Sequence, residues 1–182
     1  MKSQGAETSG SFVVWLTGLS GAGKSTLAHE LRARLLTSGK PSVVLDGDRV
    51  RSGLCSDLGF EPQDRRENVR RVAELAKLIL ESGQIAIVAL ISPTRDDRQW
   101  ARRIIGAPHF VEVYCQCPLE ICESRDVKGL YRLARSGGIG QFTGISAPYE
   151  PPLEPEVVLN TGVSGISECA GKLLTFIRTR YG

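Results

Sequence analysis

The stretch Gly18-Leu19-Ser20-Gly21-Ala22-Gly23-Lys24-Ser25 fits the phosphate-binding pattern G-x-x-x-x-G-K-[ST] at every fixed position. An apolar, β-branched run at 12–17 precedes it and predicts a buried parallel strand. Leucines that recur every four residues follow it and predict a helix that starts at Lys24. Strand, glycine-rich loop and helix in this order are the setting that the pattern needs, so we expect a nucleoside triphosphate to bind here.

The chemistry of this loop depends on its backbone and on two side chains. Glycines allow consecutive backbone N–H groups to turn inward around an anion, and the helix N-terminus adds partial positive charge. Lys24 would then reach the β- and γ-phosphates, and the Ser25 hydroxyl would bind Mg²⁺. The alternative is a glycine-rich turn that binds nothing, and the predicted strand and helix on either side disfavour it.

The length of 182 residues predicts one domain with a single substantial core. A formal net charge of +3 is mild, so it suits small anionic substrates and gives no argument for a nucleic-acid partner. No apolar run approaches the roughly 20 residues of a membrane span. Residues 1–11 lack the apolar centre of a signal peptide, so we expect a disordered lead-in to a domain at 12–182.

The five cysteines form no C-x-x-C pair, and their number is odd. Reduced thiols in a cytoplasmic protein explain this better than a disulfide framework does. Cys115 and Cys117 alternate along a predicted strand, which favours packing in the core over redox regulation.

Apolar periodicity divides the chain into alternating strands and helices. Besides 12–17, strands are predicted at 42–45, 85–91, 110–115 and 157–159, and helices at 24–36, 65–81, 95–105, 118–125 and 166–181. Asp64 and Glu67 form a variant of the capping box and mark the start of the second helix. Residues 126–155 show little periodicity and are too many for an ordinary loop. The alternation predicts a three-layer α/β fold, a five-stranded parallel sheet with helices on both faces.

In such a sheet, ligands bind outside the carboxyl ends of the strands. This rule selects five loops, at 18–25, 46–51, 92–98, 117–125 and 160–162. Asp46 and Asp48 lie in the second loop, after a strand that we expect to adjoin the phosphate loop. One carboxylate can hold Mg²⁺, directly or through water, and the other can accept a proton from an attacking hydroxyl. Spacing does not assign the two roles, and a plain Asp-Gly turn is the alternative.

A second anion site is predicted beside the first. Arg65 and Asn68 are three residues apart near the start of one predicted helix and share a face, and Arg51 lies in the preceding loop. A guanidinium beside a helix N-terminus suits a phosphate or sulfate group. Solvated surface arginines are the alternative, which we accept for the other arginines of the same helix.

Nine blocks of the sequence, taken together and in order, resemble the adenylylsulfate kinase (APS kinase) family. They are GLSGAGKST at 18–26, DGDRVR at 46–51, LGF at 58–60, DRRENVRR at 64–71, ISP at 91–93, PLEICESRD at 118–126, KGLY at 128–131, FTGI at 142–145 and YE at 149–150. Many unrelated proteins share the phosphate loop alone, whereas the later blocks in this order are highly specific. The resemblance covers about 12–161.

The resemblance implies a P-loop NTPase fold and a kinase that transfers the γ-phosphate of ATP to the 3′-hydroxyl of adenosine 5′-phosphosulfate (APS). The products would be ADP and 3′-phosphoadenosine 5′-phosphosulfate, the activated sulfate donor of sulfate assimilation. The resemblance also implies a homodimer in the cytoplasm, with functional coupling to ATP sulfurylase as an option.

Residue roles follow where the motifs match. For ATP, the resemblance implies Gly18, Leu19, Ser20, Gly21, Ala22, Gly23, Lys24, Ser25, Thr26, Arg125 and Thr161. For APS, it implies Asp48, Arg51, Phe60, Arg65, Asn68, Ile91, Ser92, Lys128 and Phe142, with the two phenylalanines stacking on the adenine. The expected catalytic residues are Lys24, Asp46, Asp48, Ser92 and Lys128. Mg²⁺ is expected at Ser25 and, through water, at Asp46.

Ser92 corresponds to a serine regarded as a possible phosphoserine site in the family. A direct in-line transfer needs only positioning and charge neutralisation, and the residues above supply both. We therefore expect Ser92 to contact the substrate through its hydroxyl or its backbone rather than to carry a phosphoryl group.

Residues 126–149 correspond to the lid of the family and carry positive charge at Lys128, Arg132 and Arg135. Their glycines would permit hinge motion, and closure would exclude water from the reaction. The chain departs from the usual family pattern at Thr94, Val127, Leu133, Gly138 and Gly140. These departures remove no residue with a chemical role, but they bear on the stiffness and charge of the lid.

Two other functions stay open on the sequence alone. A kinase of the same fold could phosphorylate a different small hydroxyl compound, but the predicted site for an aromatic base plus an anion argues against it. The chain could also be a binding or regulatory domain without activity, which the intact Lys24, Ser25, Asp46 and Asp48 disfavour.

Overall fold

The computed structural model describes residues 10–181 and contains one parallel sheet of five strands. The strands are β1 (Val13–Thr17), β2 (Ser42–Asp46), β3 (Ile85–Ala89), β4 (Phe110–Gln116) and β5 (Val157–Asn160). They stand in the order β2-β3-β1-β4-β5, and all neighbours pair in parallel. The expected α/β fold is confirmed. The predicted lead-in lies outside the described residues except for Gly10 and Ser11, of which Ser11 is buried.

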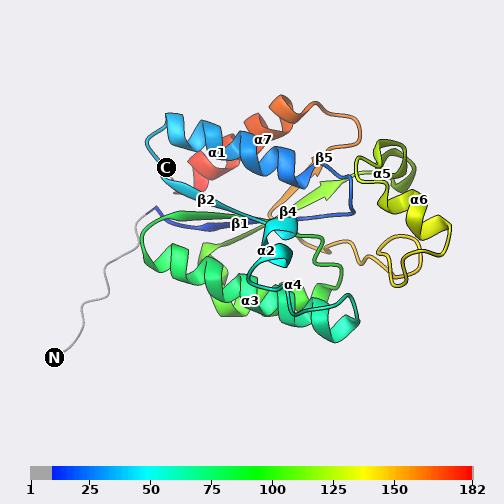
Figure 1. Ribbon diagram of the computed structural model, residues 1–182. Helices are drawn as coiled ribbons and strands as arrows, with labels where there is room; N and C mark the ends of the chain where they lie inside the picture. The colour runs from blue at the N-terminus through cyan, green and yellow to red at the C-terminus, as the bar shows by residue number, and fades with distance from the viewer. Residues whose placement is uncertain (1–9, 182) are drawn as a thin grey trace.

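Helices cover both faces of the sheet. They are α1 (Lys24–Thr37), α2 (Gly47–Ser52), α3 (Pro62–Glu81), α4 (Arg95–Ile105), the 3-10 turn η1 (Ala107–His109), α5 (Leu119–Arg125), α6 (Leu130–Arg135) and α7 (Ile166–Tyr181). Helices α1 and α7 lie together on one face, and α3 and α4 lie together on the other (Figure 1). The short α5 and α6 lie beyond the carboxyl ends of the strands (Figure 1). Among the described helices, none is both long and apolar enough to cross a membrane.

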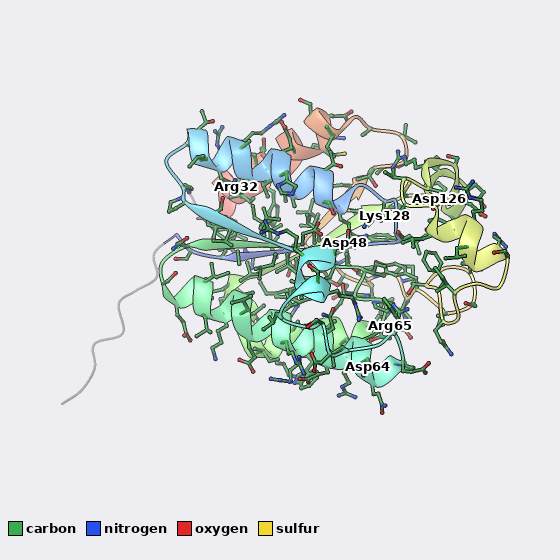
Figure 2. The ribbon with its side chains drawn as sticks, in the orientation of Figure 1. Arg32, Asp48, Asp64, Arg65, Asp126 and Lys128 are labelled. Atoms are coloured by element: carbon green, nitrogen blue, oxygen red, sulfur yellow. The ribbon has the colours of Figure 1, made fainter. Side chains whose placement is uncertain are left out.

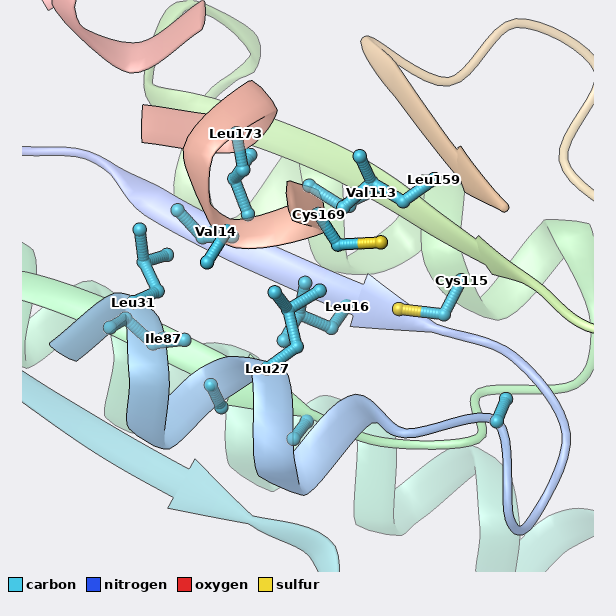
Figure 3. Packing of buried hydrophobic residues seen from close by; sticks show 14 of the residues in the cluster. Val14, Leu16, Leu27, Leu31, Ile87, Val113, Cys115, Leu159, Cys169 and Leu173 are labelled. Atoms are coloured by element: carbon cyan, nitrogen blue, oxygen red, sulfur yellow. The ribbon is translucent and has the colours of Figure 1, made fainter. Parts of the chain in front are cut away.

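The central strand β1 feeds two separate cores because its side chains alternate between the faces of the sheet. Val14 and Leu16 pack against α1 and α7, where Leu27 is one of the contacts (Figure 3). Val13 and Trp15 belong to the core under α3 and α4. Since β1 is buried on both sides, its continuous apolar run is what the position requires.

The cysteines are part of this packing. All five are free thiols and all five are buried. Cys115 and Cys169 lie in the core beside α1 and α7 (Figure 3). Burial raises the pKa of the Cys115 thiol to about 12, so it stays protonated and unreactive at neutral pH. The expected role of Cys115 and Cys117 in core packing is confirmed.

The start of α3 differs from the prediction. The helix begins at Pro62 with Glu61 as its cap residue, three residues before the expected start. Proline suits a first helical position, because its missing N–H would have no partner there. The carboxylate of Asp64 instead accepts a hydrogen bond from the backbone N–H of Gly59, and Glu67 pairs with arginines of its own helix. The capping-box interpretation was therefore wrong.

Two short helices and two details of the strands were also not predicted. Helix α2 occupies the start of a stretch expected to be turns, and α6 lies inside the segment 126–155 that was expected to be irregular. Both are six residues long, too short for apolar periodicity to reveal. Strand β3 ends at Ala89 rather than Ile91. The strand before Asp46 does not adjoin β1, because β3 lies between them.

Candidate active site

The phosphate loop needs glycine at two places for steric reasons. Gly18 and Gly21 both have positive φ angles, 150° and 74°. A Cβ atom on Gly18 would lie 2.7 Å from the carbonyl oxygen of Cys115, and one on Gly21 would lie 2.9 Å from that of Cys122. The loop therefore rests directly on the backbone of β4 and α5, and only glycine permits that approach.

The Lys24 ammonium is enclosed by the loop. The residue is 8% exposed, and its Nζ donates to the carbonyl oxygens of Gly18 at 2.8 Å and Leu19 at 2.6 Å. Burial lowers the pKa of Lys24 to about 8. The positive charge is thus held by the carbonyls of the loop in which the sequence expects the phosphates.

Ser25, at the start of α1, and Asp46, the last residue of β2, bring two side-chain oxygen groups together. The Ser25 hydroxyl donates to Asp46 Oδ2 at 2.5 Å, and the backbone N–H of Asp48 donates to Oδ1 of the same carboxylate at 3.0 Å. Asp46 is buried and caps α2 through the second bond. Both of its oxygens are therefore occupied, one by each neighbour.

Asp48 is placed differently from Asp46. Its carboxylate is exposed and forms an ion pair with the ammonium of Lys128, which follows α5 (Figure 2). The pair joins the loop after β2 to the segment 126–149. Asp48 and Lys128, both expected to be catalytic, thus contact each other beyond the carboxyl ends of the strands (Figure 2).

Arg65 connects helix α3 to the same segment. Its Nη2 donates to the carbonyl oxygen of Gln141 at 2.6 Å, and its Nη1 donates to the hydroxyl of Thr143 at 3.2 Å. Its Nε donates to the carbonyl oxygen of Phe60 at 2.8 Å. Because Gln141 and Thr143 flank Phe142 in the chain, the two sides of the predicted acceptor site are brought together.

The two phenylalanines of the predicted site differ in exposure. Phe60 is 56% exposed, and the guanidinium of Arg51 lies over its ring at 4.5 Å from the centroid. Phe142 is 8% exposed and meets Tyr131 edge to face at 5.0 Å between ring centroids. Phe60 therefore offers an open ring face, whereas most of Phe142 is part of the core.

Asn68 has a donor without a partner. The residue is 5% exposed, and within the described part of the chain its Nδ2 makes no hydrogen bond. Leaving a buried donor unpaired costs about 1–3 kcal/mol, so the amide is suited to an acceptor atom of a ligand. It lies one turn after Arg65 on α3, as expected from their spacing.

Ser92 is built into the protein interior. Its hydroxyl accepts from the indole N–H of Trp15 at 3.1 Å and donates to Thr17 Oγ1 at 3.1 Å. The residue is 3% exposed and has a φ of 39°, in the left-handed region. The carbonyl of Ile91 accepts from Thr17 at 2.7 Å. A hydroxyl held in this way favours a backbone contact to substrate over a hydroxyl contact.

Arg125 and Thr161 meet behind the phosphate loop. Arg125 donates from Nη2 to the carbonyl oxygen of Thr161 at 2.9 Å and from Nη1 to that of Gly21 at 3.2 Å. The Thr161 hydroxyl donates to the carbonyl oxygen of Gln116 at 3.2 Å. The structure thus brings together the two residues expected beside the ATP base, at the edge of the loop.

Two open hollows flank the phosphate loop. One, of about 500 Å³, is lined by Ser25, Thr26, His29, Glu30 and Ile166. The other, of about 530 Å³, is lined by Leu19, Tyr114, Pro151 and residues 144–149. The first hollow thus borders the start of α1, and the second borders Leu19 of the phosphate loop and part of the segment 126–149.

Three contacts were missed by sequence reasoning. Tyr131 donates from its hydroxyl to the carbonyl oxygen of Ser20 at 2.9 Å and so ties α6 to the phosphate loop. The Thr143 hydroxyl accepts a hydrogen bond from Arg65, and Arg98 donates one to the backbone carbonyl of Ser92. The blocks KGLY and FTGI contain the first two residues, so position in a motif was an available signal. For Arg98 there was none, because one of four arginines on a helix rich in charged residues predicts a solvated side chain.

The structure shows what surrounds the residues that depart from the usual family pattern. Thr94 caps α4, since its hydroxyl accepts from the backbone N–H of Asp97 at 3.3 Å. Val127 is 90% exposed. A Cβ atom on Gly138 would collide with the side chain of Leu133, so these two departures fit each other.

A phosphate loop at the end of the central strand, with the order β2-β3-β1-β4-β5 around it, defines a P-loop kinase. The particular family is given by comparison with known proteins. The model of the family described as adenylylsulphate kinase matches residues 10–160, and the chain belongs to that family.

Individual relatives agree with this assignment. The adenylyl-sulfate kinase of Acaryochloris marina is 52% identical over 170 residues, which cover 93% of this chain and 83% of the relative. That of Geotalea daltonii is 52% identical over 168 residues, covering 92% and 83%. The solved structure of the Mycobacterium tuberculosis APS kinase CysC in complex with AMPPNP and APS has a TM-score of 0.89 at 43% identity, covering 92% of this chain and 98% of that one.

Proposed function

We propose that the chain transfers the γ-phosphate of ATP to the 3′-hydroxyl of APS and releases ADP and 3′-phosphoadenosine 5′-phosphosulfate. The observation that carries the proposal is the buried Nδ2 of Asn68, which within residues 10–181 has no hydrogen-bond partner and lies one turn after Arg65 on α3. An amide, two guanidinium groups and the exposed ring of Phe60 together suit a flat base with an anionic tail. Family membership and the mycobacterial relative with AMPPNP and APS support it.

In this proposal the phosphate loop provides positioning and charge. Backbone N–H groups of the loop surround the phosphates, and the N-terminus of α1 adds partial positive charge. Lys24 moves its ammonium from the carbonyls of Gly18 and Leu19 to the β- and γ-phosphates. The phosphates would also raise the pKa of the amine back towards its ordinary value, since an anion favours its charged form.

The pair Ser25 and Asp46 fits Mg²⁺, because a hydroxyl and a carboxylate 2.5 Å apart are the hard oxygen donors that this ion prefers. When bound, the ion neutralises charge that builds up on the β- and γ-phosphates. Ser25 would hold it directly and Asp46 through water. The bond from the Asp48 N–H keeps the Asp46 carboxylate in this orientation.

We assign the proton acceptor to Asp48. Both oxygens of Asp46 have protein partners, whereas the carboxylate of Asp48 is exposed at the mouth of the site. As the 3′-oxygen bonds to the γ-phosphorus, its proton passes to Asp48 and the bond from that phosphorus to the bridging oxygen of ADP breaks. Lys128, beside Asp48, would stabilise the negative charge of the phosphoryl group in transfer.

Segment 126–149 serves in this proposal as a lid. It contacts the acceptor side through Lys128 and Arg65, and the phosphate loop through Tyr131. Opening would break these bonds and uncover the part of the core that Tyr131 and Phe142 fill, and closing excludes water, which would otherwise take the γ-phosphate.

The test is a screen of acceptors with the purified chain, ATP and Mg²⁺, reading ADP release and the phosphorylated product. APS should be consumed, and AMP, adenosine and gluconate should not. Lys24→Ala should abolish the reaction, which would exclude a contaminating kinase. Rapid turnover of another acceptor with none of APS would reject the proposal.

A further inference from the structure

One arginine outside the proposed site is completely enclosed by the protein. Arg98 of α4 is 1% exposed and donates three hydrogen bonds to three different segments. Its Nε donates to Glu112 Oε1 at 2.7 Å, its Nη1 to the carbonyl oxygen of Ser92 at 2.7 Å, and its Nη2 to that of Glu150 at 2.7 Å. A guanidinium has donors fixed in one plane, so the three acceptors are held at fixed relative positions.

The charge of Arg98 is balanced by a small buried network. Glu112 on β4 is 3% exposed and also accepts from Arg102 at 3.4 Å. Arg102 in turn pairs with both oxygens of Glu156, at 2.6 and 2.8 Å. Two positive and two negative side chains therefore compensate each other, which a buried charge requires.

The first backbone acceptor belongs to the proposed acceptor site. Ser92 has a φ of 39°, a conformation that persists only when its surroundings enforce it. Thr17 holds the preceding carbonyl, that of Ile91, at 2.7 Å, and Trp15 holds the Ser92 hydroxyl. Arg98 holds the Ser92 carbonyl and so completes the set of contacts that fix the loop.

The second backbone acceptor lies where the chain leaves the proposed lid. The backbone N–H of Glu150 donates to the carbonyl oxygen of Pro93 at 2.8 Å, and its carboxylate accepts from the backbone N–H of Arg95 at 2.8 Å. Glu150 is thus bound at three atoms, to the loop after β3 through Pro93 and to α4 through Arg95 and Arg98. Arg98 therefore binds both the loop 91–93 and the residue that follows the lid segment 126–149.

We propose that Arg98 is a positioning residue for the acceptor: it holds the loop 91–93 and the exit of the lid in one rigid arrangement, and so sets the affinity for APS without touching it. The role rests on the proposed function, because the loop is a substrate contact only if APS binds there. Lysine at this position would keep the charge opposite Glu112, but as a point charge it could not serve all three acceptors.

The test separates positioning from folding with two variants and a control. Arg98→Lys keeps the buried charge. Arg98→Met combined with Glu112→Leu replaces the ion pair by apolar groups, a change that is often neutral or stabilising in protein interiors. Both should raise the KM for APS about tenfold or more, while the KM for ATP stays at the wild-type value. Arg102→Lys is the matched control, because within residues 10–181 its hydrogen bonds reach neither Ser92 nor Glu150.

Thermal unfolding and amide exchange of the peptide 90–95 accompany the kinetics. Faster exchange of this peptide in both Arg98 variants, with a wild-type rate in Arg102→Lys, would support the inference. A double variant with wild-type stability and a wild-type KM for APS would overturn it, because Arg98 would then serve only folding. If the wild-type enzyme itself ignores APS, the proposed function fails, and the exchange data still decide whether Arg98 holds the loop.

Discussion

The hydroxyl of Ser25 donates to Asp46 Oδ2 at 2.5 Å, although β3 separates the strands that precede the two residues. Helix α1 makes this possible, because it starts after β1 and packs against both β3 and β2, and its first turn places Ser25 beside Asp46 at the end of β2. The pair thus joins the phosphate loop to the loop that carries both aspartates. Its geometry depends on the crossover rather than on neighbouring strands.

Removing the hydroxyl of Ser25 should test this pair. We expect Ser25→Ala to lower kcat/KM by about a hundredfold or more, since a group that organises charge at the transferring phosphate is lost. Asp46→Asn should act similarly and still fold, because asparagine is also a good helix cap. Ser25→Thr keeps the hydroxyl and should stay active. Rates measured over a range of Mg²⁺ concentrations check this, and a fully active Ser25→Ala would contradict it.

Replacing Asn68 by leucine should separate stability from substrate binding. The change removes a buried Nδ2 that has no partner within the described residues 10–181, so the free energy of unfolding should stay equal or rise by up to about 1 kcal/mol. Stabilisation of the protein by APS in thermal unfolding should disappear, while stabilisation by ATP persists. An unchanged shift with APS would mean that Asn68 does not contact the acceptor.

The pKa of Lys24, lowered by burial from 10.5 to about 8, predicts a pH dependence of stability. Between these two values the unfolded chain binds more protons than the folded one, so stability rises with pH across that window. The contribution of this lysine should follow a slope of at most about 1.4 kcal/mol per pH unit. Cysteines and tyrosines titrate there too, so the quantity to measure is the difference between wild type and Lys24→Met. A difference that stays flat from pH 8 to 10 would refute the lowered pKa.

Two glycine substitutions in the phosphate loop should differ in severity. Gly21→Ala meets both a positive φ and the carbonyl of Cys122, whereas Gly23→Ala has a φ of 85° and open space around its new Cβ. Gly23→Ala should cost about 1–2 kcal/mol of stability, the strain of a left-handed residue, and Gly21→Ala should cost more. Chemical denaturation and titration with ATP measure both. Equal losses in the two variants would show that contact with Cys122 is unimportant.

Much of this architecture was predictable, because long apolar runs and strong periodicity dominate it. The helix Arg95–Ile105 and the closing helix Ile166–Tyr181 have the predicted bounds. The strands were found because β1 and β3 are buried on both faces and therefore continuously apolar. The order of the strands in the sheet was not predicted, because it depends on which face of the sheet each crossover helix covers. Helices α2 and α6 depend on local capping by Asp46 and Asp126, which is weaker than periodicity as a sequence signal.

The site was predictable where a motif carries its own chemistry. The glycines, Lys24 and Ser25 lie as their pattern requires, and Arg65 meets the segment around Phe142 as expected from the resemblance. The inward direction of the Ser92 hydroxyl was not predictable, since it depends on Trp15 and Thr17 in a distant strand. The buried position of Arg98 was not predictable for the same reason, since its three hydrogen-bond acceptors lie at sequence separations of 6, 14 and 52.

The bond from the Tyr131 hydroxyl to the Ser20 carbonyl has a practical consequence for engineering. A segment 126–149 transplanted from another family member would keep this contact with the phosphate loop only if it brought a hydroxyl to this one backbone atom. Chimaeras built to alter turnover should therefore be chosen by the residue at position 131 first, and by the charge of the exchanged segment second.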